Sequence, residues 1–118
     1  MGLISKPAKT VSNWVAFGNT TAKDLFTLPA GARPLRFLVD VDTAFNDSGT
    51  DLLDIGKPGT AAYFANDVDV SSTGATAVAP LNNDELTAMT TVTATYTGQN
   101  SNASTGMAYV ICEYMSPF

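Results

Sequence analysis

Short apolar segments alternate with clusters of turn-forming residues along the whole of this 118-residue sequence. Gly, Pro, Asn and Asp recur at intervals of roughly 8–12 residues, a spacing typical of sandwiches and barrels built from short strands. Thr and Ala are the commonest residues. The β-branched Thr side chain suits a half-exposed strand better than a helix interior. The sequence therefore predicts an all-β antiparallel domain with little or no helix.

The clearest strand is predicted over residues 35–45. Its apolar residues recur with a period of two and are Leu35, Phe37, Val39, Val41 and Phe45. Successive side chains of a strand point to opposite faces, so this pattern predicts one buried and one solvated face. Asn46, Asp47, Ser48 and Gly49 then form a strong turn signal.

Seven further strands are predicted over residues 10–17, 24–28, 51–55, 61–70, 76–81, 86–97 and 107–115. Residues 61–65 leave open one turn of helix instead. About eight strands are enough for two packed sheets, that is, an antiparallel β-sandwich. The predicted core consists of Phe37, Val39, Val41, Phe45, Leu53, Ile55, Val92, Tyr96, Val110 and Cys112.

Two of these strands carry unusual faces. Residues 107–115 are apolar on both faces, which indicates a central strand or one covered by another subunit. The segment 86–97 places a row of threonines and Met89 on one face. Such a row suits an open sheet surface or a tight contact between subunits.

The composition excludes several classes of function. With no His and one Cys, one chain cannot build a Cys/His zinc site, a His-based catalytic triad or a disulfide. The net charge of −5 and the absence of a basic patch argue against nucleic-acid binding. No apolar run approaches the ~20 residues of a membrane span, and no secretory signal is visible. We expect no cofactor, no metal, and neither nucleic acid nor membrane as a partner.

A few residue groups invite a chemical interpretation. Asp40 with Asp42, and Asp67 with Asp69, are spaced to share a strand face, where paired carboxylates serve as acid and base or bind calcium. We interpret them as the acidic rim of a solvated face. Cys112 lies in an apolar strand and is predicted to be buried and inert. The aromatic residues Trp14, Phe17 and Phe26 suit core or interface packing better than a carbohydrate platform.

Several short motifs occur in a familiar order. They are Leu28-Pro29-Ala30-Gly31-Ala32, Val39 to Phe45, Asp54-Ile55-Gly56, Tyr63-Phe64, Asp69 to Gly74, and the last strand from Thr105 to Met115. Over roughly residues 28–115 the chain resembles a recurrent module of tailed-phage and prophage virion proteins. That module occurs in small capsid-associated proteins, in head fibres and at the ends of tail-associated chains.

The resemblance implies a compact β-sandwich of jelly-roll type, commonly trimeric and without catalytic residues. Because the chain has no long shaft or second domain, it favours a capsid decoration or cement protein over a fibre. The implied partners are the major capsid protein and further copies of the chain in a homotrimer. The implied location is the capsid surface of a virion made in the bacterial host cytoplasm. The alternative is a head-fibre, spike or tail module that binds a host receptor glycan or a fibre partner.

We expect residues 1–20 to form an N-terminal arm with a short strand, and residues 21–118 to form one sandwich domain. In a decoration protein the arm would reach across neighbouring capsomers. The residues predicted to make interface contacts are Trp14, Val15 and Phe17 near the arm, and Met89, Thr91 and Thr93 on the threonine-rich face.

Overall fold

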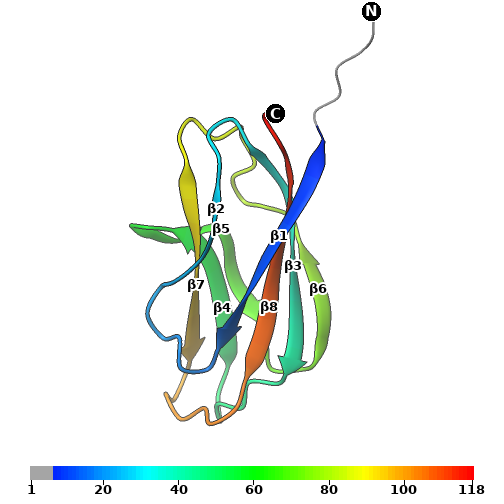
Figure 1. Ribbon diagram of the computed structural model, residues 1–118. Coiled ribbons are helices and arrows are strands. Elements are labelled where there is room, and N and C mark those ends of the chain that lie inside the picture. The colour runs from blue at the N-terminus through cyan, green and yellow to red at the C-terminus, as the bar shows by residue number, and fades with distance from the viewer. Residues whose placement is uncertain (1–6) are drawn as a thin grey trace, which may run out of the picture.

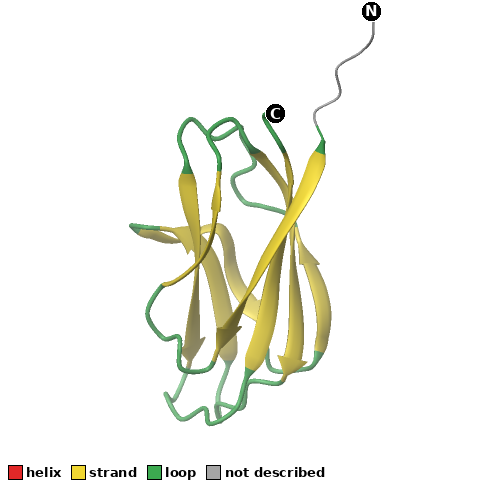
Figure 2. Ribbon diagram, in the orientation of Figure 1, coloured by secondary structure: helices red, strands yellow, loops and turns green. Residues whose placement is uncertain are grey.

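A computed structural model describes residues 7–118, and within that range the chain forms eight strands and no helix (Figures 1 and 2). The strands are β1 (Ala8–Ala16), β2 (Lys23–Leu28), β3 (Arg33–Thr43), β4 (Asp51–Lys57), β5 (Thr60–Asp69), β6 (Gly74–Val78), β7 (Thr90–Gly98) and β8 (Met107–Met115). The prediction of an all-β domain with about eight strands is confirmed. The first six residues of the expected arm lie outside the described residues.

The strands pair as a long hairpin folded over on itself. β1 pairs with β8, β2 with β7, β3 with β6 and β4 with β5, all antiparallel. Additional β3–β8 and β4–β7 pairings complete two four-stranded sheets, with orders β1-β8-β3-β6 and β2-β7-β4-β5. Eight strands arranged in two such sheets are a jelly roll, as predicted.

The core lies between the two sheets. All ten residues of the predicted core are buried, together with others such as Leu28, Phe64 and Val70. Aromatic rings link the sheets, since Phe37 packs on Phe64 with ring centroids 5.3 Å apart and Phe45 packs on Tyr96 at 4.7 Å. β8 is an inner strand of its sheet, with Ala108, Val110 and Cys112 in the core, while Tyr109 and Ile111 lie on the outer face, exposed and half-buried.

For one residue of β3, the prediction of a buried side chain is wrong. Leu35 is 39% exposed, whereas Pro34 and Phe37 are buried. The register between β3 and β8 shifts between Pro34 and Arg36, and such a bulge inserts one extra residue into the strand. The strict period of two therefore holds only from Phe37 onward, and Leu35 points outward.

The threonine-rich strand begins later than predicted. β7 starts at Thr90, because residue 86 is held by a loop rather than by the sheet. The Leu86 amide donates to the Ala32 carbonyl and the Gly31 amide donates to the Leu86 carbonyl. Residues 86–89 thus belong to the loop after β6. Residues 61–65, for which the sequence also allowed one turn of helix, are part of strand β5.

The first strand is part of the sandwich and not a separate arm. β1 pairs with β8 over its whole length, from Ala8 opposite Met115 to Ala16 opposite Met107. Val15 is fully buried among the core side chains. The sandwich thus begins at β1 and not at residue 21, and deleting residues 1–17 would remove a strand of one sheet.

Candidate functional site

One end of the sandwich exposes large apolar side chains. Both ends of the described chain lie there, and the loop between β6 and β7 crosses it (Figure 1). Three of these side chains, Phe118, Met89 and Leu81, are 81%, 74% and 64% exposed, and Leu35 at the start of β3 adds to them. We call these four residues the terminal patch. Large exposed apolar side chains at one end of a domain make that end a candidate interaction surface.

Hydrogen bonds hold the loops of this end in place. The Ser116 amide donates to the Pro7 carbonyl at 2.8 Å, which joins the two ends of the described chain. The Leu86 and Gly31 contacts described above tie the long loop to the turn after β2. The terminal patch is therefore presented on an ordered support.

A second apolar area lies on the outer face of the sheet β1-β8-β3-β6. Trp14 and Tyr109 are register partners on neighbouring strands and are 45% and 41% exposed. The Lys23 ammonium lies 3.1 Å from the centre of the Trp14 ring, and burial lowers the pKa of this amine. The half-buried side chains of Leu38 and Ile111 continue the same outer face. We call Trp14 and Tyr109 the aromatic pair.

The opposite end of the sandwich is held together by a buried carboxylate. Asp47 accepts hydrogen bonds from the backbone amides of Gly49, Asn100 and Asn102, which joins the loop after β3 to the loop after β7. Burial alone would raise the pKa of the Asp47 carboxyl, but these amide bonds outweigh it and lower the pKa. This carboxylate is a structural group that staples two loops.

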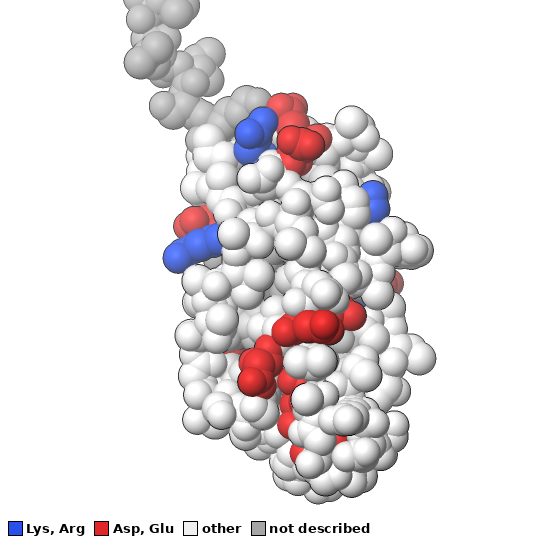
Figure 3. Space-filling model, turned by 180° about the vertical axis from the view of Figure 1, so that it is seen from behind, with Lys and Arg blue, Asp and Glu red and all other residues white. Residues whose placement is uncertain are grey.

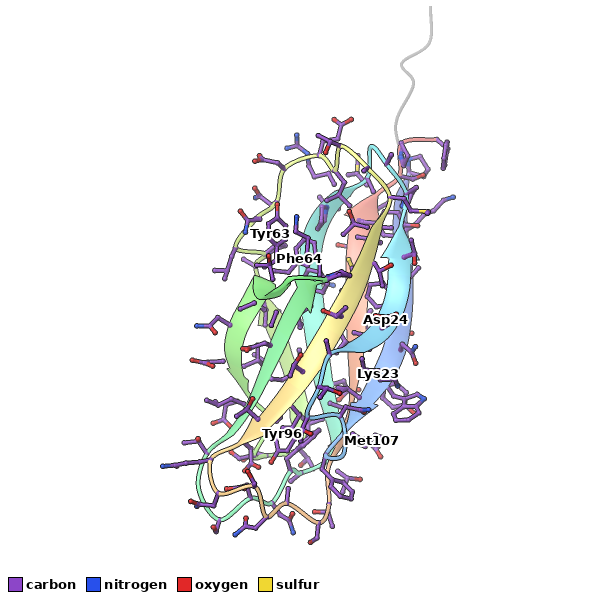
Figure 4. All side chains as sticks on the ribbon, turned by 90° about the vertical axis from the view of Figure 1, so that its left-hand side faces the viewer. Lys23, Asp24, Tyr63, Phe64, Tyr96 and Met107 are labelled. Carbon is purple, nitrogen blue, oxygen red and sulfur yellow. The ribbon has the colours of Figure 1, made fainter. Side chains whose placement is uncertain are left out.

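A second buried carboxylate supports the same loops. The Tyr96 hydroxyl, near the lower end of β7 in Figure 4, donates to Asp51 Oδ1 at 2.5 Å. The Asp47 amide donates to the same oxygen at 3.0 Å. Burial, followed by the hydrogen bond and charge of Asp51, raises the pKa of Tyr96 well above its usual value. Both partners are 2% exposed, so the bond is shielded from water.

The hollows and the acidic side chains of residues 7–118 are the features that bear on catalysis and metal binding. A hollow of about 480 Å³ is lined by Phe17, Thr20 and Tyr96 among others, and none of its lining residues is an Asp, Glu, Lys or Arg. Within residues 7–118, no three acidic or cysteine side chains come together as a metal site needs. Seen from behind, the surface is mostly uncharged, with several acidic side chains over the lower half and others beside basic side chains at the top and at one edge (Figure 3). In the same range, no helix is long and apolar enough to cross a membrane.

The structure separates the six predicted interface residues into surface and core. Trp14 and Phe17 are exposed near the end of β1, and Met89 is exposed at the other end of the sandwich. Thr91 is half-buried, with its hydroxyl oxygen 3.5 Å from that of Thr27. Val15 and Thr93, by contrast, are 0% and 1% exposed.

Val15 and Thr93 are therefore not available for interface contacts in the folded domain. Val15 faces the core because it alternates with the outward-facing Trp14. Thr93 lies on the outer face of β7, yet its hydroxyl and that of Thr95 are buried without a hydrogen-bond partner among the described residues. Neither position presents a free contact surface in the folded domain.

Four further residues are exposed although the sequence pattern does not mark them as surface residues, namely Leu35, Leu81, Tyr109 and Phe118. The exposure of Leu35 could not be predicted because the bulge shifts the alternation of β3. The exposure of Tyr109 could not be predicted because its strand is apolar on both faces. The signal at Leu81 is a large apolar residue between the turn formers Pro80 and Asn82. A core residue is not expected in such a setting.

Solved phage capsid structures contain chains of the same fold. A chain from the acid-stable capsid of Helicobacter pylori bacteriophage KHP30 aligns with a TM-score of 0.77 at 21% identity, over 98% of this chain and 92% of its own. A chain from the capsid asymmetric unit of cyanophage Pam1 gives 0.76 at 19% identity, over 99% and 90%. A chain from the capsid of Ralstonia phage GP4 gives 0.68 at 15% identity, over 100% and 90%.

These likenesses show a shared fold, and they confirm that the structural neighbours are chains of phage capsids, in line with the sequence resemblance to virion proteins. Comparison with protein-family models and with curated proteins gives no match. The comparisons thus show a fold, the jelly roll, that this chain shares with chains in those capsid structures.

Proposed function

We propose that this chain is a structural virion protein that decorates or cements the outer surface of a phage capsid and stabilises the head. The observation that carries the proposal is the likeness along 98–100% of the chain to chains of three capsid structures. Those chains are also small, because this one covers 90–92% of each. A jelly roll of this size is therefore a component of each of those capsids, as we propose for this chain.

The mechanism is mechanical and not catalytic. A homotrimer sits on the major capsid protein where neighbouring capsomers meet, and each copy buries its terminal patch against the shell. A fully buried Phe, Met or Leu side chain contributes roughly 1.5–3 kcal/mol. Several such contacts per trimer, repeated over the shell, bind far more tightly than one contact alone. The protein is made in the host cytoplasm and is located on the capsid surface.

The test is binding of the purified chain to particles that lack it. We expect saturable binding and a higher temperature of particle disruption. The variant Met89→Asp should weaken binding at least tenfold, because it places a charge in the terminal patch. The variant Asn83→Asp adds the same charge to an exposed position of the same loop and is the matched control. Absence of binding by the unmodified chain would refute the decoration role.

A second candidate function has one observation in its favour. Trp14 and Tyr109 form an exposed aromatic pair on neighbouring strands, and Asp40 stands beside Tyr109 in the same register row. Aromatic faces beside a carboxylate are suited to stacking on a sugar ring and accepting its hydroxyl hydrogen bonds. A head-fibre, spike or tail module that binds a host receptor glycan would use this surface. Glycan-array binding lost in Trp14→Ala and retained in Met89→Asp would favour it.

A further inference from the structure

Four strands lie at the edges of the two sheets, namely β1 and β6 in one sheet and β2 and β5 in the other. An edge strand presents a row of unpaired N–H and C=O groups, which is a template for pairing with another chain. Proteins that remain monomeric usually block such edges with charges, bulges or covering loops. An edge strand that lacks such blocking features is therefore available to pair with another chain.

The two edges of the sheet β2-β7-β4-β5 are blocked. On β2, Asn13 Nδ2 donates to the Leu25 carbonyl at 2.8 Å, and the strand carries a bulge next to Asp24. On β5, the carbonyls of Tyr63 and Phe64 accept bonds from Asn82 Nδ2 at 2.7 Å and the Leu81 amide at 2.9 Å. The remainder of the β5 edge is blocked by a bulge and by charged side chains.

Asp67 on β5 has a φ of 57°, in the left-handed region, where the register with β4 shifts. Its amide donates to Asp54 Oδ1 at 2.8 Å, and its carboxylate and that of Asp69 add charge to the edge. The bulge and the charges together make β5 a poor partner for another strand.

Only half of the β1 edge is blocked. The Trp14 carbonyl accepts a bond from Lys23 Nζ, and the Ala16 amide donates to Asn19 Oδ1 at 2.8 Å. Over residues 8–12, no side chain or loop of the described chain bonds to the backbone outside the β8 pairing. These five residues carry one charge, that of Lys9.

β6 has none of these protections. It is the five-residue segment Gly74-Ala75-Thr76-Ala77-Val78, without a charge or a proline, and its first four residues are exposed. Apart from the β3 pairing, no backbone group of β6 is bonded by any side chain or loop within residues 7–118. The sheet β1-β8-β3-β6 thus has an open five-residue segment at each of its two edges.

We propose that β6 of one copy pairs antiparallel with residues 8–12 of a second copy, so that the sheet continues from subunit to subunit. Each neighbouring pair in the sheet is antiparallel, so β6 runs opposite to β1. Within the sheet, β6 lies level with residues 11–15 of β1, because Gly74 shares a row with Val15 and Val78 shares a row with Val11. A rotation axis that is inclined to the strands therefore brings β6 beside residues 8–12 of the next copy, in the antiparallel direction. This head-to-tail contact uses both open edges and closes into a ring.

The alternative pairing of β6 with itself about a two-fold axis would leave the segment 8–12 unused. The two open segments are also compatible in charge, because one is neutral and the other carries only Lys9 in a chain of net charge −5. The inference rests on the proposed function, since it supplies the contact that would hold the decorating homotrimer together.

The outward faces of the strands fix which residues meet. Ala75 and Ala77 pair with Asp40 and Leu38 on the outer face of the sheet, and Thr10 pairs with Glu113 on that same face. Residues directly opposite one another in an antiparallel pair lie on the same face. Thr10 of one copy therefore stands opposite Ala75 or Ala77 of the next.

Disulfide cross-linking of the full-length chain tests the contact. The double variants Thr10→Cys/Ala75→Cys and Thr10→Cys/Ala77→Cys are oxidised both in solution and on particles. We expect one of them to form a ladder that ends at a closed ring, while the buried Cys112 stays reduced. Thr10→Cys/Asn66→Cys, which places the second thiol on the blocked β5 edge, is the matched control and should not form the ladder.

The outcomes are distinguishable from those of the function test. No inter-copy ladder in either register, in solution or on particles, overturns the contact even if the chain still binds particles. Efficient dimer formation by Ala75→Cys or Ala77→Cys alone would show β6 pairing with itself and would also overturn it. A ladder formed by a chain that does not bind particles would support the strand contact and refute the decoration role.

Discussion

Removing the Tyr96 hydroxyl should destabilise the domain strongly for so small a change. The hydroxyl donates to the buried Asp51 carboxylate at 2.5 Å, and both residues are 2% exposed. Hydrogen bonds to charged groups contribute about 1.5–3 kcal/mol. Tyr96→Phe keeps the ring that packs on Phe45, and Asp51 keeps its bond from the Asp47 amide. We therefore expect a loss of about 2 kcal/mol in the free energy of unfolding.

The assay is urea unfolding at neutral pH, supported by a thermal scan. For a domain of this length the loss corresponds to a Tm lower by about 8 °C. Tyr109→Phe is the matched control, because the exposed Tyr109 hydroxyl makes no hydrogen bond within the described chain and its loss should change stability by under ~0.5 kcal/mol. If Tyr96→Phe changed stability no more than Tyr109→Phe, the carboxylate bond would not stabilise the fold as argued.

The pH dependence gives the same bond a second test. The pKa of Tyr96 is raised in the folded chain, mainly by burial and then by Asp51, while an unfolded tyrosine titrates near 10. Above pH ~10 the unfolded state thus binds fewer protons than the folded state, so stability falls as pH rises. Tyr96→Phe lacks this loss, and its deficit relative to the unmodified chain should shrink above pH 10. A constant deficit would contradict the assignment.

Three further results are expected. Thr93→Val should raise the free energy of unfolding by about 1 kcal/mol, because it removes a buried hydroxyl without a partner; urea unfolding that shows a loss would contradict this. Burial, and then the Glu113 charge, raises the pKa of Cys112 from 9.0 to about 12, so stability should fall between those pH values. Between pH 9 and 10, below the range in which Tyr96 contributes, this slope should be absent from thermal scans of Cys112→Ala. Val15→Ala should cost about 2–3 kcal/mol, whereas Trp14→Ala should cost much less; equal losses in chemical denaturation would place Val15 outside the core.

Much of the fold follows from local patterns in the sequence. The alternation from Phe37 to Phe45 identifies the buried face of β3, and the turn clusters delimit the strands. The bulge before Phe37 leaves no comparable signal, because it arises from the register with β8. The delayed start of β7 likewise depends on hydrogen bonds of Leu86 to a loop that is distant in sequence.

The candidate surfaces were less predictable than the core. A strand pattern tells which residues alternate, but for β1 it did not tell that Val15 faces inward and Trp14 outward. The terminal patch depends on which loops meet at one end of the sandwich, and that is a property of the jelly-roll topology. The blocking of three edges by side chains and loops also becomes visible only once the strand order is known.

The central claim is that this chain is a stoichiometric component of a capsid. Its copy number relative to the major capsid protein in purified particles tests that claim most directly. We expect a simple whole-number ratio, with hundreds of copies per particle. A few copies would place the chain in a fibre, spike or tail, and absence from the particles would contradict any role in the virion.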